Sequence, residues 1–268
     1  MEALGLVDDW PADRVAVGVA SARGTLFVHG DTGEFGWASV TKPVTALACL
    51  VAAEEGTLDL DEPAGPPGST VRHLLAHASG LPFDRGSPIA KPGARRIYSE
   101  YGFEVLGETL ADRAEMPFAD YLSAAVLEPL RLGARLDGMP GSGLHGSLGD
   151  LLAIGRELLA PTLVAAETLA EATAVQFPGL MGVLPGFGRQ DLNDWGLGLE
   201  LRDHKSPHWT GSHNSERTFG HFGRSGTFLW VDPEPGIALA CLTDLEFGKW
   251  ATRAWPELSD SVLAELGS

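Results

Sequence analysis

Residues 35–43 read Phe-Gly-Trp-Ala-Ser-Val-Thr-Lys-Pro, and they open an apolar helical pattern. The segment 41–55 is rich in alanine and leucine and stops at Gly56, which predicts a helix with a glycine at its C-terminal end. Ser39 and Lys42 are three residues apart in this stretch. Because residues i and i+3 share one face of a helix, we expect the Lys42 Nζ to reach the Ser39 Oγ.

The Ser39–Lys42 pair is suited to nucleophilic catalysis. A serine hydroxyl is a poor nucleophile until a neighbouring group takes its proton. A desolvated lysine can take that proton, or it can stabilise another base by its charge. Backbone N–H groups and the positive end of a helix would also lie beside Ser39. Taken alone, Ser-x-x-Lys equally fits a serine at a helix start followed by a surface lysine.

Outward from this stretch, the chain divides into strand-like ends and a helical middle. Segments 15–20 and 25–29 are strand-like and predict a β-hairpin. The middle shows apolar residues at spacings of three and four, which predicts helices at 70–77, 100–114, 118–127, 147–159 and 165–175. Towards the C-terminus the pattern predicts strands at 195–201, 218–222, 226–231 and 237–242, and then an amphipathic helix at 250–266.

This order predicts an α/β (α+β) fold, in which the N- and C-terminal strands share one antiparallel sheet flanked by helices. The helical middle would be inserted as a second, all-helical lobe. We therefore expect residues 1–60 and 190–268 to form one discontinuous α/β lobe and residues 61–189 to form the helical lobe. A cleft between two lobes is a natural site for a small substrate.

Composition excludes several classes of partner. The 268 residues carry a net charge of -17, which disfavours nucleic acid and anionic membrane surfaces. Cys49 and Cys241 both have apolar neighbours, as free thiols of a reducing compartment do. The acidic segment 1–9 lacks the basic start and apolar run of a secretory signal, and the apolar stretch 46–53 is too short to cross a bilayer. A cytoplasmic protein is the expectation.

Three further motifs follow the Ser39 stretch in order. Segment 71–81 reads Val-Arg-His-Leu-Leu-Ala-His-Ala-Ser-Gly-Leu, segment 98–103 reads Tyr-Ser-Glu-Tyr-Gly-Phe, and segment 220–227 reads Gly-His-Phe-Gly-Arg-Ser-Gly-Thr. The whole succession resembles the class C β-lactamase and esterase branch of the serine β-lactamase and penicillin-binding-protein family. The resemblance runs from about residue 15 to residue 244 and implies a β-lactamase/transpeptidase-like fold.

The resemblance assigns roles to particular residues. The family's Ser-x-x-Lys element is met by Ser39 and Lys42. Its Tyr-x-Asn element is Tyr98-Ser99-Glu100 here, so that the tyrosine matches and the asparagine does not. Its Lys-Thr-Gly element corresponds to His221-Phe222-Gly223, a His-x-Gly form found in many esterase-like members. The resemblance further implies that the backbone N–H of Arg224 pairs with that of Ser39 as an oxyanion hole.

The general base stays open between Tyr98 and Lys42. A phenol has a reference pKa of about 10, so Tyr98 would need cations nearby, which Lys42 and a protonated His221 could supply. A histidine, unlike a lysine, need not stay cationic at neutral pH, and a neutral His221 would recognise a substrate carboxylate only weakly. Glu100 can only accept hydrogen bonds at neutral pH, and we expect its carboxylate to approach Lys42. The alternative is that Glu100 turns to solvent at a helix start. Gly223 would let a substrate lie close to the strand backbone.

The resemblance implies a serine hydrolase that forms an acyl-enzyme on Ser39 and acts on a small ester, or on an amide or β-lactam. An acyltransferase on the same scaffold is one alternative. A catalytically retired ligand-binding protein is another, which the glutamate at position 100 favours. A small-molecule substrate is the expected partner, and no sequence feature specifies an oligomeric state.

No cofactor or metal is expected. The chain has no Gly-x-Gly-x-x-Gly or Walker pattern that would cradle a nucleotide. His73 and His77 stand four residues apart without the glutamate of a zincin motif. Asp203 and the three histidines near it, at positions 204, 208 and 213, fit solvated loop residues better than a metal site.

Overall fold

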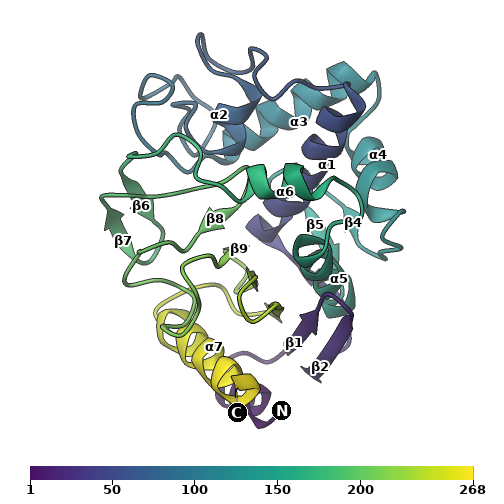
Figure 1. Ribbon diagram of the computed structural model, residues 1–268, viewed down its shortest axis with the longest axis vertical. Helices are drawn as coiled ribbons and strands as arrows, with labels where there is room; N and C mark the ends of the chain where they lie inside the picture. Colours follow the sequence, from purple (N-terminus) through teal and green to yellow (C-terminus); the bar gives the residue numbers. More distant parts are fainter. Residues whose placement is uncertain (268) are drawn as a thin grey trace.

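A six-stranded antiparallel sheet forms the centre of the computed structural model, which describes residues 1–267 (Figure 1). The first strand pairs with the last along its whole length, from Val15 opposite Thr243 to Ser21 opposite Ile237. The predicted sharing of one sheet by the two ends of the chain is therefore confirmed. In spatial order the strands are β2 (Gly24–Gly30), β1 (Val15–Ser21), β11 (Ile237–Thr243), β10 (Phe228–Asp232), β9 (Phe219–Phe222) and β8 (Glu200–Leu201).

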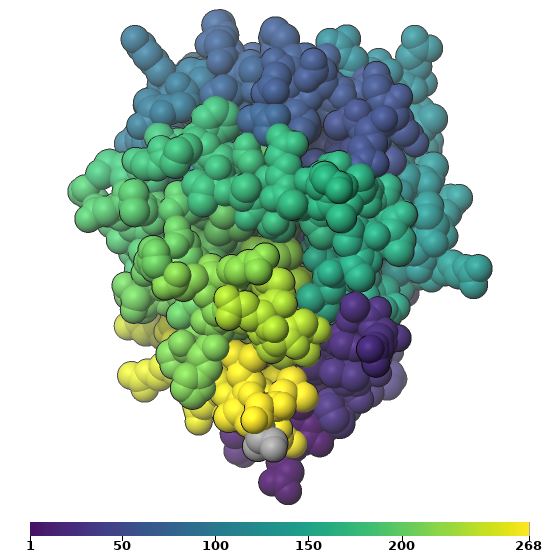
Figure 2. All heavy atoms as spheres, viewed as in Figure 1, coloured from purple at the N-terminus to yellow at the C-terminus, as the bar shows by residue number. Residues whose placement is uncertain are grey.

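Helices cover both faces of this sheet. Ala16 and Ala20 of β1 belong to the same apolar core as Leu152 of α5 (Leu148–Leu159). The alternate residue Val17 belongs to the core of the opposite face, with α7 (Ala251–Gly267) and the 3₁₀ helix η1 (Glu2–Asp9). Figure 2 shows the purple N-terminal segment and the yellow C-terminal helix at one end of the molecule. The alternation along β1 thus sorts its side chains between two helical layers.

The helix that follows Ser39 lies inside the molecule. In α1 (Thr41–Glu55) every residue from Thr41 to Ala52 is buried, and Gly56 ends the helix with φ 76°, as predicted. Within residues 1–267, no helix combines the length and the apolar character that a bilayer crossing requires. The remaining helical elements are α2 (Val71–Leu75), α3 (Glu100–Ala114), α4 (Phe118–Leu122), the π-helical turn η3 (Ser123–Leu127) and α6 (Ala166–Ala172).

Two small sheets were not predicted from the sequence. In the first, β3 (Phe35–Gly36) pairs with β5 (Leu144–Gly146), which also pairs with β4 (Arg135–Leu136). The second is the hairpin of β6 (Gly182–Leu184) and β7 (Gly188–Gln190). β3 and β4 have only two residues each, too few for a periodic pattern to show. The predicted strand at 195–201 was mostly wrong, because the chain turns at Gly198 (φ 72°) before β8 begins.

The α5 helix lies in the range that the sequence assigned to the helical lobe, yet it packs against the sheet. A Cβ on Gly155 would lie 2.8 Å from the Ala238 Cβ, which shows how closely the helix approaches β11. The proposed division into two lobes itself stays a prediction.

Replacing Gly155 by alanine should therefore destabilise the protein by about 1–3 kcal/mol, because the added methyl overpacks the contact with Ala238. Gly149→Ala in the same helix is the matched control. Its Cβ would meet only the Ser147 Oγ at 3.6 Å, so this change should be neutral or stabilise by up to about 1 kcal/mol. Urea unfolding followed by circular dichroism measures both; equal effects would contradict the close packing of α5.

Candidate active site

Ser39 lies in η2 (Ala38–Val40), a 3₁₀ turn at the head of α1. The turn is tied to the small sheet, because the Trp37 N–H donates to the Leu144 carbonyl at 2.8 Å and its indole N–H donates to the Gly146 carbonyl at 3.2 Å. Ala38 has φ 45°, a left-handed conformation that residues with a Cβ seldom adopt. Such strain persists only where the surroundings hold it, and it is common at active sites.

Lys42 is completely buried and donates to three oxygens. Its Nζ lies 3.3 Å from the Ser39 Oγ, 2.5 Å from Glu100 Oε2 and 3.0 Å from the Gly141 carbonyl oxygen. The predicted contact between Lys42 and Ser39 is confirmed. A buried ammonium group is tolerated only when its charge and its N–H groups are compensated in this way.

Glu100 begins α3 and turns inward. The Ser99 side chain caps this helix by accepting the Gly102 N–H at 2.8 Å. One oxygen of the Glu100 carboxylate meets Lys42, as expected, so the solvent-facing alternative is wrong. The other oxygen, Oε1, is buried without a partner in the described chain and faces Gly141, where a Cβ would come within 2.7 Å of it. The missing side chain at Gly141 therefore makes room for the longer acidic residue.

Tyr98 lies among aromatic rings beside Lys42. The Lys42 Nζ is 4.9 Å from the centre of the Tyr98 ring, within cation–π distance. His77 also packs against Tyr98, with its ring centre 4.6 Å from that of Tyr98. His77 also accepts the Ser99 N–H at its Nδ1 at 3.1 Å. His77 thus fixes the Tyr98–Glu100 segment, a positioning role that the sequence analysis did not assign to it.

His221, at the end of β9, is neutral at physiological pH. Burial, and after it the charge of Lys42, lowers the pKa of His221 to about 3. Of the two cations that the sequence offered to Tyr98, His221 therefore does not supply positive charge, and Lys42 remains. The sequence could not reveal this, because the shift comes from the burial of the ring, which is 3% exposed.

Gly223 brings the end of β9 against the backbone of η2. A Cβ on Gly223 would lie 2.7 Å from the Trp37 carbonyl oxygen and 3.2 Å from the Ser39 nitrogen. The next residue, Arg224, is held by the Phe247 N–H, which donates to its carbonyl at 2.8 Å. In the described chain no protein acceptor engages the Arg224 N–H. Its side chain points outward, is 83% exposed and lies 3.4 Å from Glu246.

Ser39, Tyr98, His221 and Arg224 line one cavity of about 290 Å³. Lys42 and Glu100 lie behind Ser39, outside the cavity wall. The structure thus gathers the residues singled out by the sequence around one space. The rest of the wall is mainly apolar and is made by Phe83, Leu184, Pro185, Trp195, Phe222 and Phe247, together with Glu200.

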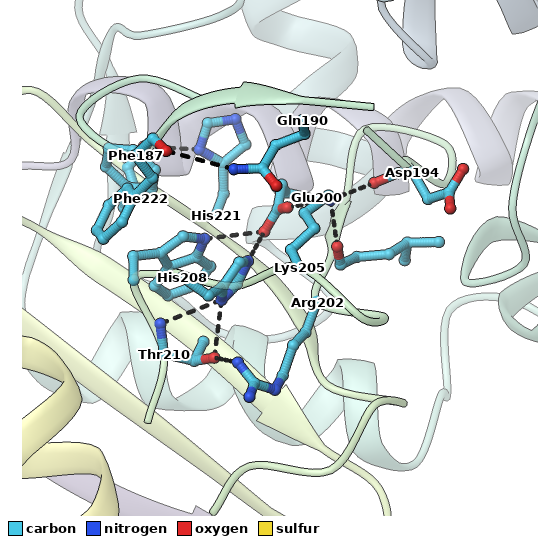
Figure 3. Close-up of polar contacts among 12 residues, drawn as sticks. Phe187, Gln190, Asp194, Glu200, Arg202, Lys205, His208, Thr210, His221 and Phe222 are labelled. Carbon is cyan, nitrogen blue, oxygen red and sulfur yellow. Dashed lines mark hydrogen bonds and ion pairs between the residues drawn. The ribbon is translucent and has the colours of Figure 1, made fainter. Parts of the chain in front are cut away.

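Glu200 belongs to a buried polar cluster that sequence reasoning missed (Figure 3). Its carboxylate accepts hydrogen bonds from Lys205, from His208 Nε2 at 2.8 Å and from Trp209 Nε1 at 2.8 Å. Burial alone would raise the pKa of Glu200, but His208 and Lys205 outweigh it and hold the pKa at about 2. The expectation of a solvated His208 was wrong. Among residues 1–267, no group of acidic, histidine and cysteine side chains is arranged to hold a metal ion.

Comparison with known proteins identifies the family of this chain. The β-lactamase family model matches residues 6–137 and 131–262. This chain belongs to the β-lactamase family. A β-lactamase structure from Mycobacterium bovis is 54% identical, with a TM-score of 0.97 over 98% of this chain and 99% of that one. Membership in the β-lactamase family confirms the predicted fold and supports a hydrolase.

More distant relatives share the fold or a part of the sequence. Penicillin-binding protein 4* of Bacillus subtilis is 27% identical over 128 residues, which cover 35% of this chain and only 28% of that protein. EstCE1, described as a hydrolase with promiscuous acyltransferase activity, is 18% identical with a TM-score of 0.78 over 97% of both chains. At that identity the likeness to EstCE1 shows the fold alone.

Gly223→Ala should lower kcat/KM for an ester by about a hundredfold, because the methyl would push β9 away from the Ser39 N–H. Gly248→Ala is the control, since its Cβ would come no closer than 3.6 Å to any atom. Steady-state kinetics with p-nitrophenyl acetate, on variants shown by thermal melting to be folded, measures the effect. If Gly223→Ala is as active as Gly248→Ala, the close contact of Gly223 with the Ser39 backbone is not needed for catalysis.

Proposed function

We propose that this chain is a serine hydrolase that forms an acyl-enzyme on Ser39 and acts on a small, uncharged ester. The observation that carries the proposal is the Ser39 hydroxyl, which accepts a hydrogen bond from the buried Lys42 and lines an apolar cavity. Family membership supports hydrolysis in general. The ester preference follows from the charges around the cavity.

Tyr98 is the proposed general base. Two of the acceptors of Lys42 are a carboxylate and a carbonyl, so its Nζ must donate to both. The negative charge of Glu100 stabilises the ammonium form, and an ammonium group cannot take the Ser39 proton. Lys42 instead places its positive charge beside Tyr98, with Nζ 4.9 Å from the centre of the ring.

The proposed acylation uses these groups as follows. The Ser39 Oγ attacks the ester carbonyl while Tyr98 takes its proton. The N–H groups of Ser39 and Arg224 stabilise the oxyanion that forms. The C–O bond to the leaving alcohol breaks, and Tyr98 returns the proton to that alcohol. Water then attacks the acyl-enzyme while Tyr98 takes its proton. The bond to the Ser39 Oγ breaks, Tyr98 returns the proton to Ser39, and the acid is released.

An uncharged substrate suits this cavity better than a penicillin does. A penicillin carries a carboxylate, which needs a cation or several donors when it is removed from water. His221 stands where the family has a lysine, and it is neutral. Among the described residues of the cavity wall, Arg224 is the one cationic side chain, and it points outward towards Glu246.

Ser39→Ala should reduce hydrolysis of p-nitrophenyl acetate to the rate without enzyme, because no other hydroxyl is placed against Lys42 in the described chain. The fold should stay intact, since Ser39 is partly exposed and needs no repacking. Spectrophotometric kinetics and thermal melting check both statements. Turnover near the wild-type rate in Ser39→Ala would refute the proposed function.

Tyr98→Phe and Lys42→Met should each lower kcat/KM by about a hundredfold or more, because each removes part of one proton path. Lys42→Met also leaves Glu100 buried without its cation, so Lys42→Met/Glu100→Gln is the variant to compare. Adding Tyr98→Phe to Lys42→Met/Glu100→Gln should lower kcat/KM little more than either change does alone. Fully multiplicative losses would show that Tyr98 and Lys42 act independently.

Glu100→Asn should raise acylation by a penicillin relative to a simple ester. The change removes a negative charge from behind Ser39, and that charge disfavours an anionic substrate such as a penicillin. Stopped-flow acylation rates with benzylpenicillin and p-nitrophenyl acetate give the ratio. Glu100→Gln is the control for side-chain length, because it makes the same change of charge and chemistry at the length of glutamate. If the ratio of the penicillin acylation rate to the ester acylation rate stays unchanged or falls, Glu100 does not influence the choice of substrate.

A further inference from the structure

Two polar atoms in the cavity wall have no partner in the described chain. Trp195 and His221 both line the cavity and are only 2% and 3% exposed. Trp195 Nε1 and His221 Nε2 are buried and form no hydrogen bond. Nearly all buried polar groups in proteins are hydrogen-bonded, so an unpaired pair in one cavity calls for a ligand that satisfies it.

The two atoms have opposite hydrogen-bonding character. His221 Nδ1 lies 2.7 Å from the Phe222 carbonyl oxygen, which can only accept, so Nδ1 carries the hydrogen. The ring is neutral because burial disfavours its charged form, and Nε2 is then left with a lone pair. The indole nitrogen of Trp195 can only donate. One donor and one acceptor, both buried and unpaired, therefore belong to residues of the cavity wall.

The rings that carry these atoms are close together and held in place. The ring centres of Trp195 and His221 are 5.5 Å apart, with 70° between their planes. Trp195 also packs edge-on against His77 at 4.6 Å and lies 5.8 Å from Tyr98. Its carbonyl accepts the Gln176 N–H at 2.9 Å. A ligand group that meets this pair thus finds it already oriented beside the proposed base.

We infer that Trp195 and His221 form a polar subsite that selects esters carrying a neutral hydroxyl group. This inference rests on the proposed function and deepens it. One hydroxyl oxygen can accept from Trp195 Nε1 and donate to His221 Nε2, with each bond about 2.9 Å long. Such a hydroxyl needs the two nitrogens to be no more than about 6 Å apart, and the centres of the rings that carry them are 5.5 Å apart.

Other substituents fit this pair less well. A carboxylate would face the lone pair of His221, and an ammonium group would face the N–H of Trp195, in a cavity where neither charge is compensated. A methyl group would leave both nitrogens without a hydrogen bond, and a buried polar atom without a hydrogen bond weakens binding. A primary amide also donates and accepts, but it is larger than a hydroxyl, and the test below separates the two.

The test compares esters that differ in one group. p-Nitrophenyl 3-hydroxybutyrate and p-nitrophenyl 3-methylbutyrate differ by a hydroxyl in place of a methyl, and the ratio of their kcat/KM values is measured in each enzyme. Trp195→Phe keeps an aromatic ring and removes the donor, so the ratio should fall about tenfold. His221→Phe should lower it similarly. Comparing ratios between enzymes cancels the intrinsic reactivity of the two esters.

Trp250→Phe is the matched control, because Trp250 donates to the Glu246 carbonyl at 2.8 Å and lies outside the cavity wall. Its ratio should equal that of the wild type. A ratio unchanged within twofold in Trp195→Phe would overturn the subsite. A second pair of esters, p-nitrophenyl succinamate and p-nitrophenyl 4-methylpentanoate, compares a primary amide with an isopropyl group. If Trp195→Phe changes the ratio of kcat/KM values for this pair and leaves the first ratio unchanged, the ligand is an amide and the hydroxyl assignment is overturned.

A binding measurement separates this inference from the proposed function. Ser39→Ala cannot form an acyl-enzyme, and calorimetry with 3-hydroxybutyranilide and 3-methylbutyranilide compares the same two groups without turnover. The hydroxyl anilide should bind about tenfold more tightly, and Trp195→Phe should abolish that difference. Equal affinities in Ser39→Ala would overturn the subsite even if Ser39 proves to be the nucleophile. Absence of Ser39-dependent turnover, with the tenfold difference intact, would overturn only the proposed function.

Discussion

The buried ammonium group of Lys42 is the constraint on which the site depends. A charge this deep in the protein is stable only where oxygens meet each of its N–H groups, and here those oxygens come from three separate segments. Ser39 lies in η2 at the head of α1, Glu100 begins α3, and Gly141 lies in the loop before β5. Satisfying the Lys42 side chain therefore fixes α3 and the loop before β5 relative to the nucleophile.

Charge compensation also determines what the cavity can accept. Lys42 is neutralised by Glu100, and Glu200 in the cavity wall is neutralised by Lys205. His221 is uncharged because burial opposes its protonation. With its charges paired internally, the cavity offers apolar rings and isolated donors and acceptors. Such a surface binds neutral molecules well and leaves a buried anion without compensation.

The sequence predicted what depends on local pattern. The helix after Ser39, the N-terminal hairpin, the shared antiparallel sheet and the contact of Glu100 with Lys42 all followed from spacing or from the order of motifs. The charge of His221 stayed open in the sequence and the buried bonds of His208 to Glu200 were missed, because both depend on residues distant in sequence that enclose them. Short paired segments such as β3 were missed for a related reason, since their pairing is non-local.

The central claim is that Ser39 is the nucleophile and that Lys42 sustains its reactivity. Intact-protein and peptide mass spectrometry after treatment with a fluorophosphonate tests it most directly. The structure predicts a single label on the peptide that contains Ser39, no label in Ser39→Ala, and much slower labelling in Lys42→Met/Glu100→Gln. A label on another residue, or a wild-type enzyme that stays unlabelled under conditions that label a known serine hydrolase, would contradict the account.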